Sequence, residues 1–450
     1  MKKRYPRYLF AVLAIVLTVS MLAACGGGAT SSPGSNAPSS APSSGAQGSS
    51  APTDSGGAKT KPPRDYVLVG IINPATGALA GFGEGEDWVQ NQFLDYVNNE
   101  LGGIYIKDYD TKLPIKFITY DSESDTTKAT DLAQKLITDD KVDLIIVRHT
   151  PETVNPVTAV AERFQVPCIS MDAPVDAWLA EGPYEWVYHA FWNLDSMYAC
   201  YHSLWQKAGF GPGAKVGLLF ANDADGTAWA SVFNSKIVAD GYVLVDPGQY
   251  PVMTQDFSDI IQLFIREGVD IVCGTNINPD FATFWRQAKQ LGFKPGFVTM
   301  GKAYLLESDA MAIGADLMDG LAGEVWWSPT HPFKSALTGL TPKDLADKYL
   351  ADTGRKITQP MGCKYTTFEI LADVLSRTAS LDKNDIIASL AATDLDTVFG
   401  HVKYNSDHYS LTPLTGGQWR KNSSGGLDLI IVDNSQNPNI PTTGDLVPLK

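Results

Sequence analysis

Residues 142–147 constrain the fold more than any other stretch, because five of their six side chains are apolar. An apolar run of this length is typical of a strand that is buried on both faces of a parallel sheet. Thr150 and Pro151 follow at once and suit the N-cap and first position of a helix, although Asn155 and Pro156 offer an alternative start. In both cases the free backbone N–H groups of the helix point into the crevice beyond the strand, where open α/β sheets bind ligands.

Strand and helix patterns alternate along most of the chain. Apolar strand patterns occur at 66–72, 115–120, 142–147, 167–170, 216–220, 242–245, 269–273 and 297–300. This alternation predicts an α/β fold with doubly wound parallel sheets and helices on both faces. Because the pattern restarts after an aromatic-rich crossover at 178–192, we expect two similar lobes. We interpret the aromatic side chains of this crossover as hinge packing in preference to a ligand platform.

Composition agrees with two core-containing domains and excludes one class of partner. The chain has 450 residues, of which 44% are apolar and 10% aromatic. Its net charge is −15, and no cluster of Lys and Arg occurs after the first seven residues. Because nucleic-acid binding needs a basic face, we expect no nucleic-acid partner.

The amino-terminal segment predicts export and lipid anchoring. Residues 1–24 combine a basic start with an apolar run, which is typical of a signal peptide. Leu22-Ala23-Ala24-Cys25 resembles a bacterial lipobox, which implies cleavage before Cys25 and a lipid on its sulfur. Residues 25–64 are rich in Gly, Ser and Pro and predict a flexible linker. We therefore expect the folded part to be tethered at the extracytoplasmic face of the bacterial cell membrane.

Motifs for enzymatic or metal chemistry are missing from the sequence. No GxSxG, HExxH or Walker pattern occurs, and the histidines show no metal-ligand spacing. The cysteines beyond residue 25 are Cys168, Cys200, Cys273 and Cys363, and each is far from the next in sequence. We therefore expect no cofactor, no metal and no enzymatic activity, and we interpret these cysteines mainly as buried apolar residues.

Several motifs, taken in order, resemble the periplasmic binding proteins for branched-chain amino acids. They are Pro74-Ala75-Thr76-Gly77 with Phe82-Gly83, residues 98–104 and 120–125, Asp256-Phe257, Gln287-Ala288, Thr397-Val398 and Gln418-Trp419. The similarity covers roughly residues 65–435. It implies the type I binding-protein fold, in which two α/β lobes joined by three crossovers close by hinge motion on a small solute. A membrane ABC transporter permease then receives that solute, and the binding protein itself is expected to be a monomer.

The resemblance also implies domain boundaries and ligand-binding positions. The first lobe is expected at 65–188 with 321–414, the second at 189–320 with 415–435, and a tail at 436–450. The positions that match ligand contacts in the family are Phe82, Thr150, Glu152, Thr153, Asp172, Ala173, Pro174, Asp225, Thr227, Asn276 and Lys302. Alternative interpretations are that Lys302 is a solvated surface lysine, that Asp225 only forms a turn and that Phe82 belongs to the core.

This sequence departs from the amino-acid binders at three of these places. Their first loop offers consecutive serines, whereas this chain has Thr150-Pro151-Glu152-Thr153, and Glu152 would oppose an anion if it pointed inward. Lys302 stands where they have a carboxylate, and Asp225 stands where they have a tyrosine. The ligand therefore stays open between amino acids, short amides and carboxylates, and Asp172 or Asp225 is available for an ammonium. A sensor subunit for a membrane receptor is the alternative function.

Overall fold

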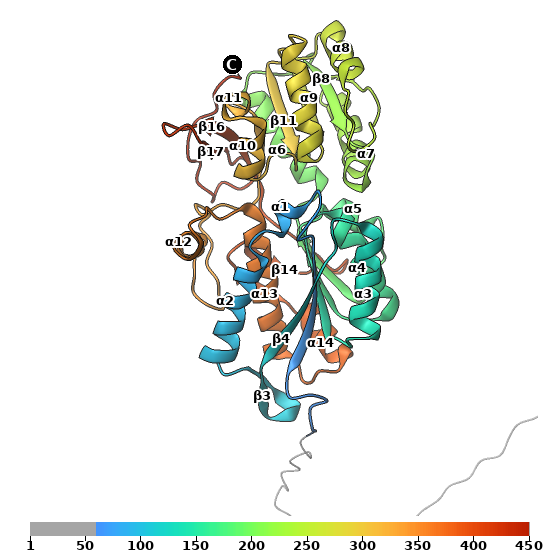
Figure 1. Ribbon diagram of the computed structural model, residues 1–450, viewed down its shortest axis with the longest axis vertical. Coiled ribbons are helices and arrows are strands. Elements are labelled where there is room, and N and C mark those ends of the chain that lie inside the picture. The colour runs from blue at the N-terminus through green and yellow to red at the C-terminus, as the bar shows by residue number, and fades with distance from the viewer. Residues whose placement is uncertain (1–59, 450) are drawn as a thin grey trace, which may run out of the picture. The chain divides into compact units, whose positions relative to one another are not determined.

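The computed structural model describes residues 60–449, and the predicted signal peptide, Cys25 and most of the predicted linker lie outside these residues. The described part contains a six-stranded and a seven-stranded sheet with helices on both faces (Figure 1). None of its helices combines the length and the apolar character that a membrane span requires.

The first sheet is parallel throughout and has the strand order β15-β7-β6-β5-β1-β4. Its strands are β1 (Val67–Asn73), β4 (Ile115–Asp121), β5 (Leu144–Val147), β6 (Cys168–Met171), β7 (Val187–Phe191) and β15 (Tyr409–Leu411). The side chains of β1 alternate between two cores, because Val67 and Val69 face one and Leu68 faces the other. This double burial explains the nearly continuous apolar runs in the sequence.

Helices cover both faces of this first sheet. They are α2 (Glu86–Leu94), α3 (Thr126–Thr138), α4 (Pro151–Phe164), α13 (Gln359–Arg377) and α14 (Lys383–Ala391). Apolar residues of α3 and α4 form one core with the sheet, and those of α2 and α13 form part of the other. In Figure 1, α13 and α14 are orange among blue and teal elements, which shows that a late segment of the chain completes the first lobe.

The second sheet is mixed, with the order β17-β16-β12-β11-β10-β8-β9. Its strands are β8 (Lys215–Phe220), β9 (Val243–Val245), β10 (Ile271–Thr275), β11 (Phe297–Gly301), β12 (Ala322–Val325), β16 (Thr415–Lys421) and β17 (Leu427–Asp433). The first five strands along the chain are parallel, whereas β16 and β17 form an antiparallel pair, and β16 also pairs antiparallel with β12. The short connection between β16 and β17 allows only a hairpin, so this edge departs from the parallel pattern.

The helices of the second lobe are α6 (Leu194–Lys207), α7 (Ala224–Ala239), α8 (Ser258–Glu267), α9 (Asn278–Gln290), α10 (Glu307–Ile313) and α11 (Ala315–Met318). The remaining elements are α1 (Ala80–Gly83), α5 (Val175–Leu179), α12 (Pro342–Thr353), a π-helix (Asp95–Glu100), a 3₁₀-helix (Lys107–Tyr109) and the strand pairs β2 (Ile104–Ile106) with β3 (Thr111–Leu113) and β13 (Asp394–Thr397) with β14 (Gly400–Lys403). The sequence patterns missed most of these short elements, together with α6 and with β7, whose aromatic residues were assigned to the crossover.

The chain passes between the two sheets three times, after β7, after β12 and after β15. Two of the predicted lobe boundaries need correction. The boundary at 188 cuts through β7, which belongs to the first sheet up to Phe191, and the boundary at 320 precedes β12, which pairs within the second sheet. The third boundary, at 414, lies between β15 and β16.

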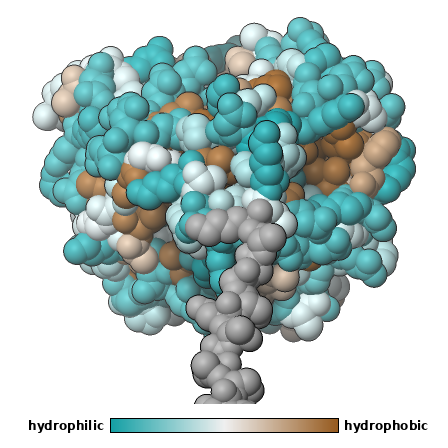
Figure 2. All heavy atoms as spheres, turned by 90° about the horizontal axis from the view of Figure 1, so that it is seen from below, coloured by the Kyte–Doolittle hydropathy of each residue, from teal (hydrophilic) through white to brown (hydrophobic). Residues whose placement is uncertain are grey.

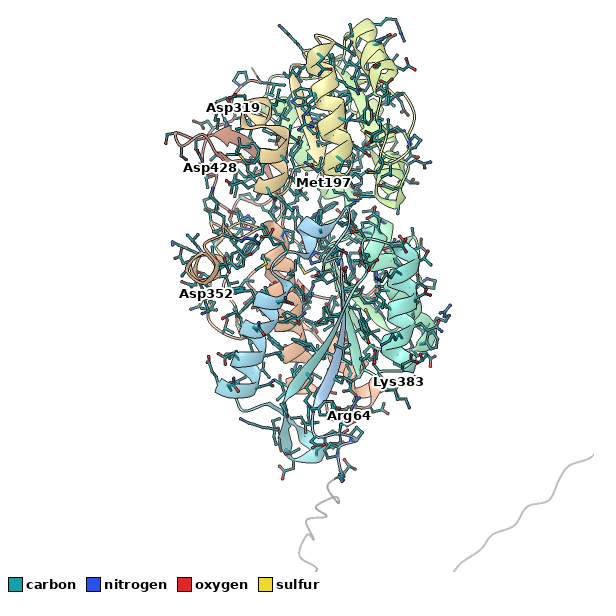
Figure 3. The ribbon with its side chains drawn as sticks, viewed as in Figure 1. Arg64, Met197, Asp319, Asp352, Lys383 and Asp428 are labelled. Atoms are coloured by element: carbon teal, nitrogen blue, oxygen red, sulfur yellow. The ribbon has the colours of Figure 1, made fainter. Side chains whose placement is uncertain are left out.

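Lys356, which follows α12, links the two lobes beyond the crossovers. Its Nζ lies 3.0 Å from Glu307 Oε1 in α10 and 3.4 Å from Asp428 Oδ1 in β17. Figure 3 labels Asp428 in the second lobe and Asp352, four residues before Lys356, on the first. The ion pairs of Lys356 with Glu307 and Asp428 are solvent-exposed, so we expect them to contribute little to stability.

Seen from below in Figure 2, the first lobe presents mainly hydrophilic side chains, between which hydrophobic ones gather in separate patches.

Gly226, in the first turn of α7, allows the helix to approach β8 closely. A Cβ added at Gly226 would lie 2.0 Å from the carbonyl oxygen of Ala221, the residue after β8. We therefore expect Gly226→Ala to force the backbone apart and to lower the free energy of unfolding by about 1–3 kcal/mol. Gly211→Ala is the matched control, because a Cβ there meets no atom within 4 Å. Thermal melts of both variants would test this, and equal melting temperatures would contradict it.

Candidate ligand-binding site

A cavity lies where the two lobes and two of the crossovers meet. Its lining residues are Phe82, Thr150, Pro151, Asp172, Pro174, Phe191, Trp192, Asp225, Trp229, Thr275, Lys302, Leu305, Glu324 and Trp326. They come from the ends of parallel strands and from the helix starts that follow them. The cavity thus occupies the crevice that the sequence predicted beyond β5 and β6, which is where open α/β sheets bind ligands.

The first lobe supplies the loops after β5 and β6. The helix α4 starts at Pro151 with Thr150 at its N-cap, which confirms the first of the two predicted starts and leaves Pro156 inside the helix. Thr150 and Asp172 both have positive φ angles of 68°, and the Thr150 N–H donates to the Asp172 carbonyl oxygen at 2.8 Å. Positive φ is costly for residues other than glycine, so the fold holds these loops in place against backbone strain.

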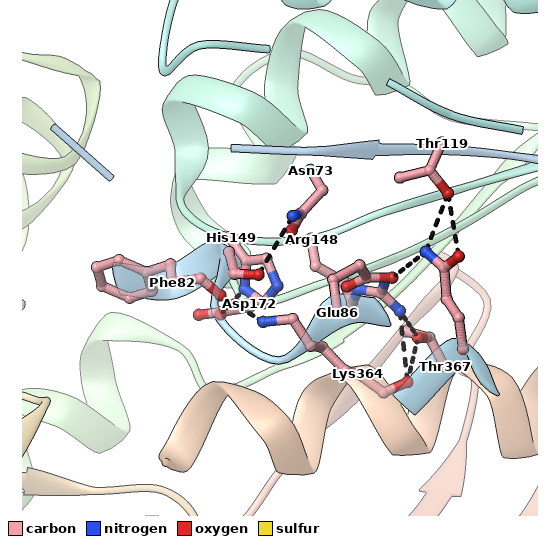
Figure 4. Close-up of polar contacts among 11 residues, drawn as sticks. Asn73, Phe82, Glu86, Thr119, Arg148, His149, Asp172, Lys364 and Thr367 are labelled. Carbon is pink, nitrogen blue, oxygen red and sulfur yellow. Dashed lines mark hydrogen bonds and ion pairs between the residues drawn. The ribbon is translucent and has the colours of Figure 1, made fainter. Parts of the chain in front are cut away.

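A buried network of charged side chains lies next to Asp172 (Figure 4). Asp172 Oδ2 lies 2.7 Å from His149 Nδ1, and the Lys364 ammonium donates to the carbonyl oxygen of Phe82. Arg148 donates to Glu86 Oε1 at 2.6 Å. The sequence patterns did not reveal this network, because its members follow β5 or lie on α2 and α13, far apart in the chain.

Burial sets the protonation of this network. It lowers the pKa of His149 well below the usual value, so the imidazole is neutral at pH 7. Burial also lowers the pKa of Lys364 to about 8 and raises the pKa of Asp172 well above its usual value.

Lys302 joins the two lobes across the cavity. It follows β11 in the second lobe, and its Nζ lies 2.9 Å from Glu152 Oε1 in the first turn of α4 and 3.7 Å from Asp225 Oδ2. Lys302 is 7% exposed, so it is not a solvated surface lysine. Burial opposes both charges, but the attraction between them prevails, so the pKa of Glu152 is lowered and that of Lys302 is raised. Glu152 therefore points inward, the arrangement that we expect to oppose an anionic ligand.

The predicted site residues fall into two groups in the structure. Phe82, Thr150, Asp172, Pro174, Asp225 and Lys302 line the cavity, and Glu152 contacts Lys302. Thr153 is buried within α4, the Ala173 carbonyl hydrogen-bonds His189 Nε2, Thr227 Oγ1 accepts from Gln249, and Asn276 Nδ2 donates to the Leu219 carbonyl. The structure does not place this second group in the lining, and the ligand contacts of both groups stay predictions.

Four large aromatic residues of the lining were not predicted as ligand contacts: Phe191, Trp192, Trp229 and Trp326. Phe191 and Trp192 end the aromatic-rich crossover, which was interpreted as hinge packing. Trp178, by contrast, packs within the core of the first lobe, where it stacks on Tyr184 and His189. Glu324 was also missed, because nothing in its sequence surroundings distinguishes a strand residue that faces a cavity.

The described residues contain no cluster of His, Cys, Asp or Glu that suits a metal ion. Cys168, Cys200, Cys273 and Cys363 are buried and free. Burial raises the pKa of each of these thiols, so they are unreactive small apolar residues.

Glu324 makes the stability of the unliganded protein depend on pH. Burial raises its pKa to about 7, although the Tyr201 hydroxyl donates to it at 2.6 Å. Because the folded state favours the protonated form, the stabilisation is complete below the unfolded pKa and is lost as pH rises through about 7. Urea unfolding at pH 5 and pH 8 should show a smaller loss in Glu324→Gln than in the wild type, by on the order of 3 kcal/mol. Equal losses in the two proteins would show that Glu324 is ionised throughout.

Comparison with known proteins gives a consistent family. The model of the family described as periplasmic binding protein matches residues 67–425. The Leu/Ile/Val-binding protein homolog 8 of Brucella abortus is 24% identical over 373 residues, which are 79% of this chain and 88% of the relative.

Solved structures agree with the fold. A leucine binding protein, LivK, from Thermotoga maritima superposes with a TM-score of 0.69 at 19% identity, covering 82% of this chain and 99% of that chain. A solute binding protein of an ABC transporter from Rhodopseudomonas palustris, in complex with 3,4-dihydroxybenzoic acid, superposes with a TM-score of 0.67 at 20% identity. The match covers 85% of this chain and 98% of that chain. These likenesses confirm the predicted two-lobed type I fold. The chain belongs to the periplasmic binding protein family, whose members bind solutes outside the cytoplasm and are not enzymes.

Proposed function

We propose that this protein is the solute-binding lipoprotein of an ABC transporter. It captures a small polar solute, an amino acid, amide or carboxylate, between its two lobes and delivers it to the permease. The observation that carries this proposal is the cavity whose lining combines Asp172 of the first lobe with Asp225 and Lys302 of the second. A solute held by side chains of both lobes stabilises the closed arrangement over an open one, and a membrane partner can recognise that difference.

The relatives support this class of function and leave the ligand broad. The Brucella relative is named a Leu/Ile/Val-binding protein homolog, and the Rhodopseudomonas structure holds 3,4-dihydroxybenzoic acid. A LivJ substrate binding protein from Streptococcus pneumoniae holds isoleucine and gives a TM-score of 0.67 at 17% identity, covering 85% of this chain and 100% of that chain. Ligands change at this level of identity, so the residues of the cavity decide the solute of this chain.

The amino-terminal sequence supports anchoring in the membrane. Acyl chains on Cys25 bury their CH₂ groups in the bilayer at roughly 0.8 kcal/mol each, and the linker 25–64 then lets the folded part move while it stays close to the permease. The protein acts as a monomer in this proposal. A membrane receptor in place of the permease would make it a sensor subunit with the same ligand site.

A ligand screen tests solute binding. Thermal melts of the full-length protein in detergent, with amino acids, short amides, and aromatic and aliphatic carboxylates, should show a rise in melting temperature for at least one compound. A ligand at a hundredfold excess over its Kd contributes about 2.7 kcal/mol. Asp172→Asn should weaken binding of that compound, whereas Asp259→Asn, on the exposed side of α8, should not. Absence of any shift across the panel would contradict the proposal.

Replacement of the lipidated residue tests the anchor. Cys25→Ser removes the sulfur that carries the lipid, so the protein should move from the membrane fraction to the soluble fraction of the cell envelope or the medium. Fractionation followed by immunoblotting measures this, with Cys200→Ser, a buried cysteine of the folded part, as the matched control. Membrane retention of Cys25→Ser would show that another segment anchors the chain.

A further inference from the structure

Aromatic rings at right angles to each other form much of the cavity wall. The ring centroids of Trp192 and Trp229 are 6.1 Å apart with an angle of 87° between the planes. Phe191 and Trp326 are 5.0 Å apart, also at 87°. The face of an aromatic ring carries partial negative charge, so aromatic rings in a cavity wall can attract a cation that lies over a ring face.

Carboxylates outnumber cationic side chains in the lining. Asp172, Asp225 and Glu324 contribute carboxyl groups, whereas Lys302 is the one cationic side chain that lines the cavity among residues 60–449. Lys302 is already paired with Glu152 at 2.9 Å and with Asp225 at 3.7 Å. Within the described part of the chain, the cavity lining therefore has no unpaired cationic side chain for an anionic ligand, whereas Asp172 and Glu324 form no ion pair with a cationic side chain of the lining.

The pKa values of these carboxyl groups agree with the excess of carboxyl groups over cationic side chains in the lining. Burial raises the pKa of Asp225 to about 7 in spite of the opposing effect of Lys302, and it raises the pKa of Glu324 to about 7 as well. A positive charge placed in the cavity would return both groups to the ionised form, whereas a negative charge would raise both pKa values further.

Glu152 occupies the place that would otherwise favour an anion. The amino-terminal end of α4 and a lysine together make a good anion site. In this chain Glu152, in the first turn of α4, turns its own carboxylate to Lys302. A ligand carboxylate would have to displace Glu152 or approach it closely, and both cost free energy because the pair is buried.

Unpartnered polar atoms complete the description of the ligand. Asp225 Oδ1 is buried and has no hydrogen-bond partner among the described residues, so it can accept from an ammonium. The indole N–H groups of Trp192, Trp229 and Trp326 likewise lack partners within residues 60–449. They can donate to a neutral oxygen, such as a hydroxyl group of the ligand.

We propose, resting on the proposed function, that the solute of this protein is an organic amine without a carboxylate. Its ammonium group lies against the ring faces and is neutralised by Asp225 and Asp172. A neutral oxygen on the ligand accepts from the indole N–H groups. The Lys302–Glu152 pair stays intact in the complex.

Two sets of matched compounds test this on the full-length wild-type protein by isothermal titration calorimetry. The first set is tyramine, tyrosine and 3-(4-hydroxyphenyl)propanoate, which share a phenol and differ only in the groups on the side chain. The second set is 3-methylbutylamine, leucine and 4-methylpentanoate, which share a branched alkyl group. We expect the amine in at least one set to bind about tenfold or more tightly than its partners.

Each outcome separates the inference from the proposed function. Tighter binding of an acid or an amino acid than of the matching amine would overturn the inference and would leave solute binding established. If no member of either set binds, titration with choline and tetramethylammonium follows. No binding of these two cations, in a protein that binds a carboxylate or amide from the broad screen, again overturns the inference alone. No binding of anything overturns both.

Substitution of the carboxylates supplies a second test. Asp225→Asn keeps the hydrogen bond to Thr275 but removes the negative charge, so the Kd for the amine should rise about tenfold or more. Asp259→Asn, on the exposed side of α8 in the same lobe, is the matched control and should bind like the wild type. Asp172→Asn is measured in the same way, so that a folded variant remains if a thermal melt shows that Asp225→Asn is unfolded. Wild-type affinity for the amine in every variant that is folded would show that these carboxylates do not recognise the ammonium.

Discussion

The functional architecture depends on one constraint, which is that parallel strands buried on both faces must send their connections out at the same edge of the sheet. In the first lobe this edge carries the loops after β5 and β6, and in the second it carries the start of α7 and the residues after β11. The crossovers after β7 and β12 place these two edges around one cavity, to which they also contribute Trp192 and Trp326. Residues from four distant parts of the sequence thus line one cavity without any local motif.

Charge burial in the cavity is the second determinant, and it separates this protein from a generic amino-acid binder. Lys302, the one lysine of the lining, pairs with Glu152 in the first turn of α4. Both groups that would favour an anionic ligand, the lysine and the start of α4, are therefore occupied by the carboxylate of Glu152. Breaking such a buried pair is costly, because it leaves an uncompensated charge. Next to the cavity, Arg148 and Glu86 form a similar buried pair, which holds the end of β5. His149, the next residue after Arg148, contacts the carboxyl group of Asp172. Polar groups that are satisfied in this way fix the geometry of the site before a ligand arrives.

Aromatic residues decide the remaining character of the cavity. Rings from β7, from the crossovers and from α7 meet at right angles in the cavity wall, so much of the lining is aromatic. The sequence showed that aromatic residues are concentrated at 178–192, but it could not separate those that pack into the first lobe, such as Trp178, from those that line the cavity, such as Trp192. This difference depends on where β7 ends and on which direction the chain takes between the sheets.

The sequence by itself determined the alternation of strands and helices, the two lobes, a helix start soon after β5 and the crevice beyond β5, because hydrophobic periodicity and capping residues act over a few neighbouring positions. Only the tertiary structure decided that Glu152 turns toward Lys302, that β12 and the antiparallel pair β16–β17 complete the second sheet, and that Glu324 and Trp229 reach the cavity. These features depend on contacts between residues far apart in the chain. Pairing of buried charges and packing of rings are satisfied globally, so no local pattern encodes them.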